Sequence, residues 1–362
     1  MYDIGIIGAG PAGATLARLL ADRYRVLLLN SGQQKCCGGI LAERSQKVLA
    51  KLGLILPEQV VIAPQPVAVA IMDWDNHLFR RYARRYVNID RAAFDCWLVS
   101  LIPPTVDIRN RAIYQFSERQ TEGLTLHFTE KDEPQSAQVR WLVGADGAFS
   151  TVRREFFPNA LMPKRYIAVQ HWFERDAVAI DAPFKFNPCK FDPWSDYTGI
   201  FDKTLTDFYL WMIPKHQQLI LGGAFPLESN TSATMEMVKE KLASLGLHLG
   251  TPFKREAAQT LRPLRQASLC FGDDRVILVG EASGLISPSS AEGISGALDS
   301  AFHLANAFNQ STAEATGFDP ALYRRLLRER LWKLWFKKFR VPPMFNPLLR
   351  KCVMLSGLTA LR

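Results

Sequence analysis

The N-terminal part of the chain places an amphipathic stretch between two short apolar runs. The runs cover residues 4–7 and 25–29, and each predicts a buried strand. Residues 11–22 carry apolar side chains at helical spacing, and Pro11 suits the first turn of a helix. A strand, a helix and a strand within about 30 residues form the unit from which parallel sheets are built. The start of the chain therefore predicts a β-α-β unit.

Strand patterns dominate the middle of the chain, and helical patterns return near its end. In chain order, the expected elements are strands over 67–72 and 78–86, a helix over 90–101, short strands near Val106, Ile113, Leu124 and Val139, strands over 166–173, 207–213 and 218–224, a helix over 235–245, a buried strand over 275–279, a long helix over 293–308 and a basic amphipathic helix over 320–340.

The order of these elements predicts an α/β fold with a discontinuous nucleotide-binding domain. Parallel-sheet signals occur at the start and near residue 280, and β-rich sequence lies between them. We expect a Rossmann-like domain, an inserted β-rich substrate domain and a helical C-terminal part. The predicted boundaries are 1–62, 88–160 and 258–310 for the nucleotide domain, 63–87 and 161–257 for the substrate domain, and 311–362 for the C-terminal region.

Composition narrows the class of protein. Hydrophobic residues make up 48% of the 362 residues and charged residues 22%, as in a globular protein with a full core. No apolar run reaches the roughly 18 residues of a membrane span, and no signal peptide is expected before the first strand. The six cysteines form no Cys-x-x-Cys pair and the six histidines show no metal spacing, so we expect a cytoplasmic protein without a metal site.

The net charge of +9 favours anionic partners such as phosphates or acidic lipid headgroups. We expect no nucleic-acid partner.

A glycine-rich turn joins the first strand to the first helix. In Gly8-Ala9-Gly10-Pro11-Ala12-Gly13, the first glycine permits the tight turn, Gly10 lets a pyrophosphate approach the backbone, and Gly13 lets helix and strand pack closely. The phosphates would sit at the helix N-terminus, where free N–H groups favour anions. The second strand ends in Asn30, where an acidic residue would normally hold the ribose hydroxyls. The asparagine keeps an acceptor oxygen but loses the charge.

Two further motifs follow strands. Gly144-Ala145-Asp146-Gly147 ends the strand over 141–143, and Gly280-Glu281-Ala282 ends the strand over 275–279. A carboxylate in the second of these positions can accept hydrogen bonds from a polyol. Pro288 and Glu292-Gly293-Ile294 then lead into the long helix, whose first N–H groups can face an electron-rich ring edge.

The three motifs, in this order, resemble the FAD-dependent family that includes aromatic hydroxylases and geranylgeranyl reductases. The resemblance implies non-covalent FAD binding, with Glu281 replacing the aspartate that contacts the ribityl chain. It also implies that Arg91, in Asn88-Ile89-Asp90-Arg91, reaches FAD. The expected cofactor-binding residues are Gly8, Gly10, Pro11, Ala12, Gly13, Asn30, Cys37, Gly38, Gly39, Arg91, Asp146, Gly147, Gly280, Glu281, Pro288, Gly293 and Ile294.

Two motifs narrow the resemblance to the reductases. Cys37-Gly38-Gly39 looks like their Cys-Gly-Gly element, and the segment from Tyr209 to Pro214, followed by Gly222, is similar to their Tyr-x-Trp-x-Phe-Pro…Gly-x-Gly substrate motif. Ile213 replaces the phenylalanine and Ala224 the last glycine. The resemblance implies that Tyr209, Trp211 and Pro214 contact substrate. Flavin halogenases carry a similar Trp-x-Ile-Pro string, so that subclass stays open.

These resemblances imply reduction of carbon–carbon double bonds in an isoprenoid-like, apolar small molecule. The alternatives are an NAD(P)H-dependent monooxygenase or halogenase that acts on an aromatic, and a non-catalytic flavin-bound regulatory or resistance protein. Cys37 is either a proton donor or redox partner near the flavin, or a small residue beside a turn. Tyr209 and Trp211 either line a cavity or pack in a core.

NAD(P)H, or another electron donor, would dock transiently, because the chain has no second glycine-rich nucleotide motif. The basic cluster Arg80, Arg81, Arg84 and Arg85 either meets its phosphates or an acidic lipid, or forms a solvated face.

The basic helix expected over 320–340 has an apolar stripe that suits contact with acidic membrane at the inner face. The stripe consists of Leu322, Leu326, Leu327, Leu331, Leu334, Trp335 and Phe339. The alternative is that it packs on the substrate domain and closes the cavity, which leaves the charges in water.

Overall fold

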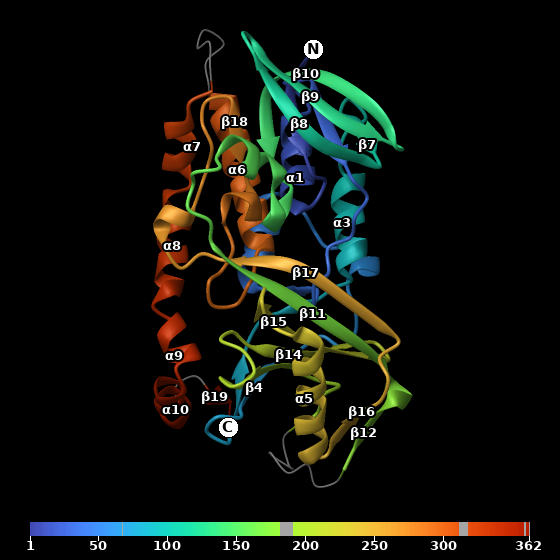
Figure 1. Cartoon of the computed structure of the whole chain (residues 1–362), viewed down its shortest axis with the longest axis vertical. Coiled ribbons are helices and arrows are strands. Elements are labelled where there is room, and N and C mark those ends of the chain that lie inside the picture. The colour runs from blue at the N-terminus through green and yellow to red at the C-terminus, as the bar shows by residue number, and fades with distance from the viewer. Residues whose placement is uncertain (67, 182–190, 311–317, 358–359, 362) are drawn as a thin grey trace.

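Two large sheets organise the computed structural model, which describes residues 1–66, 68–181, 191–310, 318–357 and 360–361 (Figure 1). The first sheet has the strand order β7-β2-β1-β10-β9-β8, and β18 pairs with β10. The second has the order β17-β11-β15-β14-β13-β4-β5-β19. The α/β fold and the helical C-terminal part expected from the sequence are confirmed.

The first sheet holds the nucleotide motifs. Its strands are β1 (Tyr2–Ile7), β2 (Val26–Asn30), β7 (Asp107–Asn110), β8 (Ala112–Gln120), β9 (Gly123–Glu130), β10 (Glu133–Gly144) and β18 (Val276–Leu278). Strands β7, β2, β1, β10 and β18 run parallel, whereas β8, β9 and β10 form an antiparallel meander. Because parallel strands end at the same edge of a sheet, the loops after β1, β10 and β18 meet there.

Helices cover this sheet through a continuous apolar core. They are α1 (Pro11–Leu20), α2 (Glu43–Lys51), α3 (Arg91–Ser100), α4 (Thr151–Phe156) and α6 (Ile294–Gln310). Leu16 and Leu20 of α1 and Leu298 of α6 are fully buried against Ile4 and Leu28 of the sheet. The helix starts are set locally, because the Asp90 carboxylate accepts from the Ala93 N–H and the Ser150 hydroxyl from the Arg153 N–H.

The second sheet is mostly antiparallel. It consists of β4 (Ala68–Asp73), β5 (Leu78–Ala83), β11 (Lys164–Glu174), β13 (Tyr197–Phe201), β14 (Leu210–Lys215), β15 (Gln218–Pro226), β17 (Lys254–Arg262) and β19 (Ala360–Leu361). Helix α5 (Thr231–Ser244) buries Met235, Val238 and Leu242 against one face. The other face carries Tyr209, Trp211 and Ile213 in a separate cluster.

Two small sheets and five short 3₁₀ helices complete the part of the chain described before the C-terminal helices. The strand pairs are β3 (Ile40–Leu41) with β6 (Val87–Asn88) and β12 (Val178–Ile180) with β16 (Leu247–Leu249), and the 3₁₀ helices are η1 (Glu58–Val60), η2 (Gly147–Phe149), η3 (Arg175–Ala177), η4 (Gln266–Ser268) and η5 (Gly280–Ser283). Strand β6 crosses the predicted domain boundary at 87/88, and β17 crosses the one at 257/258.

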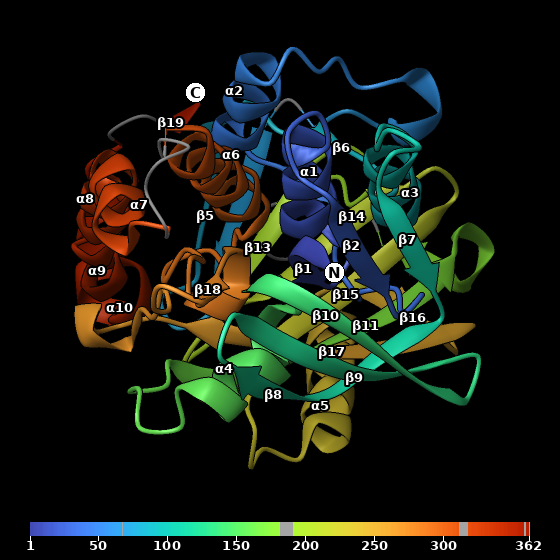
Figure 2. The ribbon, with the colours of Figure 1, turned by 90° about the horizontal axis from the view of Figure 1, so that it is seen from above.

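Four C-terminal helices run along one flank of both sheets (Figures 1 and 2). They are α7 (Pro320–Leu326), α8 (Arg328–Lys338), α9 (Val341–Phe345) and α10 (Pro347–Leu355). The single helix expected over 320–340 is thus two helices that meet at Leu327. No helix in the described ranges has the length and apolar character needed to cross a bilayer.

The apolar stripe predicted for this region mostly faces the protein. Leu322, Leu327 and Leu334 are buried, and Leu326 and Leu331 pack on the same core. Only Phe339 of the stripe is strongly exposed. The stripe therefore holds α7 and α8 on the core of the nucleotide domain, and not on the substrate domain as the alternative had it.

Candidate functional site

A cavity of about 2100 Å³ lies between the nucleotide loops and the second sheet. One end is lined by the glycine turn after β1, and the floor by residues of β13, β14 and β15. The far end is lined by residues of α8, α9 and α10. Segments from the whole chain line this one cavity. It is therefore the natural place for a cofactor and a substrate side by side.

The glycine turn has the tight bend at Gly8 and the close helix contact at Gly13 that the sequence predicts, and it leaves Gly10 open. Gly8 has φ +101°, and a Cβ there would lie 2.7 Å from the Ala145 carbonyl oxygen. A Cβ at Gly13 would lie 1.8 Å from the Gly8 carbonyl oxygen, so only glycine permits this contact between helix and turn. A Cβ at Gly10 would meet no described atom within 4 Å, although Gly10 lines the cavity together with Pro11 and Ala12. Gly10 therefore leaves open space at the N-terminus of α1, where an anion binds well.

Asp146 supplies an acceptor beside this turn. One of its carboxylate oxygens accepts from the Thr151 and Val152 N–H groups, at 2.7 and 3.2 Å. The other oxygen is buried and has no partner among the described residues. Burial raises the pKa of Asp146, and its hydrogen bonds act in the opposite direction. Asp146 and Gly147 both line the cavity, so this oxygen is placed to accept from a ligand donor.

Glu281 lines the cavity but is already engaged by the protein. Its Oε1 accepts from the Thr260 hydroxyl at 3.1 Å and the Leu261 N–H at 3.0 Å, and its Oε2 pairs with Lys35. Gly280 does not line the cavity, since its N–H bonds to Ser300 and a Cβ there would lie 3.1 Å from the Ala12 Cβ. Gly280 therefore acts by letting η5 approach α1.

The start of α6 also reaches the cavity. Gly293 and Ile294 line it, and the Glu292 carboxylate caps the helix by accepting from the Ser295 N–H at 2.8 Å. Pro288 does not line the cavity, and its carbonyl accepts from the Arg262 Nε at 2.9 Å. The helix start, rather than Pro288, is therefore what a ligand would meet.

Asn30 and Arg91 lie on the nucleotide side of the cavity. The Asn30 side chain accepts from the Gly32 N–H and donates to Asn110, so it orders the turn after β2. Arg91 pairs with Asp95 at 2.9 Å. Although burial acts to lower it, Asp95 and Cys37 raise the pKa of Arg91, which places a permanent cation near the Cys37 thiol.

The Cys37-Gly38-Gly39 segment lines the cavity above a buried lysine. Lys215 donates to the carbonyl oxygens of Gly39 and Ile89, at 3.2 and 2.7 Å, and to the Asn88 side chain at 2.5 Å. The Lys215 side chain is 4% exposed and has no carboxylate partner in the described ranges. Burial lowers the pKa of Lys215 to about 7. Lys215 therefore ties the cysteine-glycine segment to the second sheet.

Tyr209 and Trp211 both line the cavity, whereas Pro214 does not. The Tyr209 hydroxyl donates to the Ser290 carbonyl at 2.9 Å. Burial raises the pKa of Tyr209 to about 12. The Pro214 carbonyl accepts from the Asn88 side chain at 2.8 Å, so Pro214 acts in the strand connection that carries Lys215.

Small residues make room for the aromatic side chains. In the register of the second sheet, Gly222 lies between Gln170 and Trp211, and Gly199 lies beyond Trp211. A Cβ at Gly222 would lie 2.4 Å from the Trp211 Nε1. The indole therefore lies flat on the sheet beside Gly222, and the glycine of the motif is a packing requirement for Trp211.

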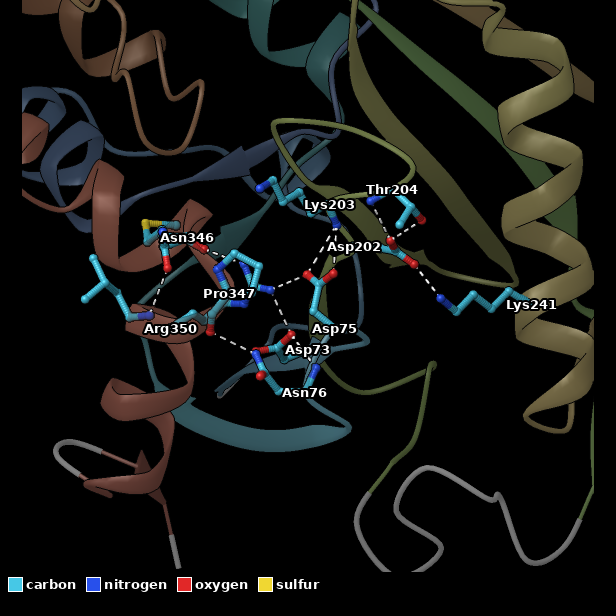
Figure 3. A network of polar contacts seen from close by, with 12 residues as sticks. Asp73, Asp75, Asn76, Asp202, Lys203, Thr204, Lys241, Asn346, Pro347 and Arg350 are labelled. Atoms are coloured by element: carbon cyan, nitrogen blue, oxygen red, sulfur yellow. Dashed lines mark hydrogen bonds and ion pairs between the residues drawn. The ribbon is translucent and has the colours of Figure 1, made fainter.

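A polar network fixes the C-terminal wall of the cavity (Figure 3). Arg350 of α10 is buried and pairs with Asp73 at 2.8 Å and Asp75 at 2.5 Å. Asn76 donates to the Pro347 carbonyl at 2.9 Å. Arg350 also lies over the Phe201 ring, 4.9 Å from its centre, and lines the cavity. The C-terminal helices are thus anchored to β4 and β13 as one side of the site.

Of the predicted arginine cluster, two members have structural roles. Arg80 donates to the Met354 and Phe79 carbonyls, and Arg81 pairs with Asp196 at 2.7 Å. Arg84 and Arg85 are exposed, and Arg84 lines the cavity.

Within the described residues, no three His, Cys, Asp or Glu side chains are grouped as for a metal ion.

Sequence reasoning missed Lys215, Gln170 and Arg350. Lys215 directly follows the Tyr209–Pro214 motif, and a lysine inside a buried strand was the available signal. Gln170 and Arg350 had no signal, because only strand register and helix docking bring them to the cavity.

The residues present fit FAD. The open backbone at Gly10, the free N–H groups of α1 and the orphaned Asp146 oxygen suit a dinucleotide with a polyol chain.

Comparison with known proteins agrees with this fit. The chain is 36% identical to Protein CbrA of Escherichia coli O6:H1 over 363 residues, which cover 98% of this chain and 93% of that one. No family model matches the chain. A geranylgeranyl bacteriochlorophyll reductase-like protein from Thermoplasma acidophilum has a similar structure, with a TM-score of 0.77, 16% identity and coverage of 97% and 90%.

A probable FAD-dependent monooxygenase from Pseudomonas aeruginosa, pqsL, superposes with a TM-score of 0.68, 16% identity and coverage of 96% and 98%. These two likenesses show the fold, and the likeness to CbrA shows the family. The chain belongs to the CbrA family and has the fold of FAD-dependent oxidoreductases of the geranylgeranyl reductase and monooxygenase type.

Proposed function

We propose that this protein uses FAD to reduce carbon–carbon double bonds in an isoprenoid-like or other apolar lipid. The carrying observation is that Tyr209, Trp211 and Ile213, which belong to one apolar cluster, line the same cavity as the glycine turn. An apolar surface of this kind binds a hydrocarbon chain and excludes water from it.

The nucleotide side would hold the cofactor. Gly10 and the N-terminus of α1 would receive the pyrophosphate, Asp146 and Glu281 the polyol hydroxyls, and Gly293 and Ile294 the ring edge. Bound FAD, once reduced, supplies a hydride from its N5 to one alkene carbon. The residues around the cofactor would deliver a proton to the other alkene carbon.

The proton would come from Cys37 or from water. Cys37 lines the cavity beside Arg91, and the Gly39 N–H donates to its sulfur at 3.5 Å. Its neighbour Cys36 is a poorer candidate, because burial raises the pKa of Cys36 to about 12. Tyr209 holds its proton in the bond to Ser290, so it serves as wall rather than acid.

The electron donor would be NAD(P)H or another reductant that docks transiently. Arg84 and Arg85 are the members of the arginine cluster that remain at the surface to meet its phosphates.

Anaerobic turnover tests this function. The FAD-loaded protein, reduced with dithionite, should be reoxidised by geranylgeraniol without oxygen, with a product that has gained two hydrogen atoms. Flavin that stays reduced with prenyl compounds under these conditions would contradict the proposal.

The second candidate is an NAD(P)H-dependent monooxygenase or halogenase that acts on an aromatic. The Trp-x-Ile-Pro string and the fold of pqsL favour it. Oxygen-dependent NAD(P)H oxidation with a hydroxylated or halogenated product would establish it. A flavin that no donor reduces would instead support a non-catalytic regulatory or resistance role.

A further inference from the structure

Helix α8 presents three different faces. Its leucine face is buried, with Leu334 3% exposed against the core. A second face carries Trp332, Phe336 and Phe339, which we call the aromatic stripe. These side chains are 63%, 49% and 75% exposed. These three rings form a chain of contacts, with 4.1 Å between the first two ring centres and 6.1 Å between the last two. Their spacing of four and three residues places them in one stripe.

The third face is basic and reaches the cavity. Lys333, Lys337 and Arg340 each follow a residue of the aromatic stripe by one position, so the two stripes adjoin along the helix. All three basic residues line the cavity. Lys333 and Arg340 are also exposed, as is Val353 of α10, which lines the cavity too. The cavity therefore reaches solvent between α8 and α10, beside the aromatic stripe.

Helix α10 adds apolar surface on the same flank of the molecule (Figures 1 and 2). Leu348, Leu349 and Leu355 are exposed. A gathering of large exposed apolar side chains is unusual on a soluble protein and marks a surface that meets something other than water.

The charge around this apolar surface is strongly positive. Residues 318–357 contain ten lysine and arginine residues but only Asp319 and Glu329 as acids. Of the ten, Arg330 and Arg350 are buried and paired with aspartates of other segments. Glu329 is already paired with Lys333. Aromatic and leucine side chains among lysines and arginines are typical of a segment that lies in the interface of an anionic membrane.

We propose that α8 and α10 form a docking face for an anionic lipid bilayer, with the cavity opening held against the membrane. On docking, the rings of the aromatic stripe enter the headgroup region while Lys338 and Lys351 remain at the level of the phosphates. An apolar ligand then passes from the bilayer to the cavity, past Lys333, Lys337 and Arg340, without crossing water.

This inference goes beyond the proposed reaction, and it is tested without turnover. The full FAD-loaded chain is mixed with vesicles of phosphatidylcholine alone or with phosphatidylglycerol, and bound protein is measured by co-sedimentation. We expect binding to the anionic vesicles, little binding to phosphatidylcholine, and release as salt rises. Equal recovery in the supernatant with both lipids at low salt would overturn the proposal.

Variants then locate the contact. Replacing the aromatic stripe by Trp332→Ser, Phe336→Ser and Phe339→Ser should reduce vesicle binding at least tenfold. The matched control is Ile55→Ser, Met237→Ser and Phe253→Ser, which removes three exposed apolar side chains elsewhere and should bind as wild type does. Both triple variants change exposed residues, and retained FAD absorbance verifies the fold.

Charge is tested separately. Lys338→Gln with Lys351→Gln should weaken binding to anionic vesicles several-fold and flatten its salt dependence.

Unchanged binding of the aromatic variant would contradict the proposal. So would a dimer of the wild-type protein that this variant dissociates, since a second copy would then cover the face.

Discussion

The two long walls of the cavity are made in different ways. The nucleotide wall is mainly backbone: Gly8, Gly10 and Gly13 shape it, and Asp146 offers a buried oxygen with no partner in the described chain. The wall formed by the second sheet is mainly side chains, and the Tyr209 hydroxyl already has a protein acceptor in Ser290.

This difference assigns different ligands to the two walls. Free N–H groups and an orphaned carboxylate oxygen are costly to bury unless a polar ligand meets them. The rings of Tyr209 and Trp211 offer a mainly apolar surface, and the Tyr209 hydroxyl is engaged, whereas the Trp211 Nε1 has no partner among the described residues. Under the proposed function, one cavity would bind a charged, polar cofactor on one side and a hydrocarbon on the other, and each wall can be altered separately.

The largest effect is expected at Gly10. A valine there meets no described protein atom within 4 Å of its Cβ, so the chain should fold, but the side chain fills the space that the pyrophosphate needs. Gly10→Val should purify largely colourless with a wild-type circular dichroism spectrum. Yellow protein at wild-type FAD stoichiometry would remove the pyrophosphate from this turn.

Glu281→Ala should weaken FAD binding about ten- to a hundredfold, because a ribityl hydroxyl loses its acceptor at roughly 1–3 kcal/mol. Titration of the apoprotein with FAD measures this. Thr260→Val is the matched control, since it removes a hydrogen bond to the same carboxylate without removing the acceptor. Equal dissociation constants for wild type and Glu281→Ala would exclude the role in FAD binding.

Trp211→Ala should act on the other wall only. We expect binding of geranylgeraniol, followed by flavin fluorescence, to weaken about tenfold, or about 1.4 kcal/mol, with FAD affinity retained. Trp172→Ala is the control, because Trp172 lies in the same sheet, on β11, which β15 separates from β14, and does not line the cavity. Loss of FAD in Trp211→Ala would mean that the two walls are not separable.

The remaining effect, on stability rather than on ligand binding, concerns Lys215, which joins the walls. Its pKa is lowered to about 7 by burial, whereas an unfolded lysine titrates near about 10.4. Between these values the unfolded chain binds more protons, so this residue makes stability rise with pH, by on the order of 1 kcal/mol per unit. Lys215→Met should lack this rise in denaturant midpoints measured from pH 7 to pH 10. Parallel curves for the two proteins would contradict a titrating Lys215.

The nucleotide wall was largely predictable because its parts are local in sequence. Each motif directly follows a strand, and parallel strands bring their ends together. The expected residues that do not reach the cavity, Gly13, Gly280 and Pro288, pack the loops that do. Sequence spacing does not distinguish residues that line the cavity from residues that pack its loops, because both kinds lie close to the turn.

The second wall was predictable only in part. Tyr209 and Trp211 were recognised from a motif, but Gln170 reaches the cavity through the register of β11 on β15. The basic helix over 320–340 was expected, yet its leucine stripe is buried and a different stripe is exposed. A helical pattern with two apolar stripes does not show which one meets the core.

The most direct test of the central claim is the structure of the FAD-loaded protein with geranylgeraniol bound. The account predicts the flavin ring beside Gly293 and Cys37, with the prenyl chain between the ring and the side chains of Tyr209 and Trp211. A flavin ring with both aromatic side chains on the far side of the sheet, or a prenyl chain bound outside the cavity, would contradict it.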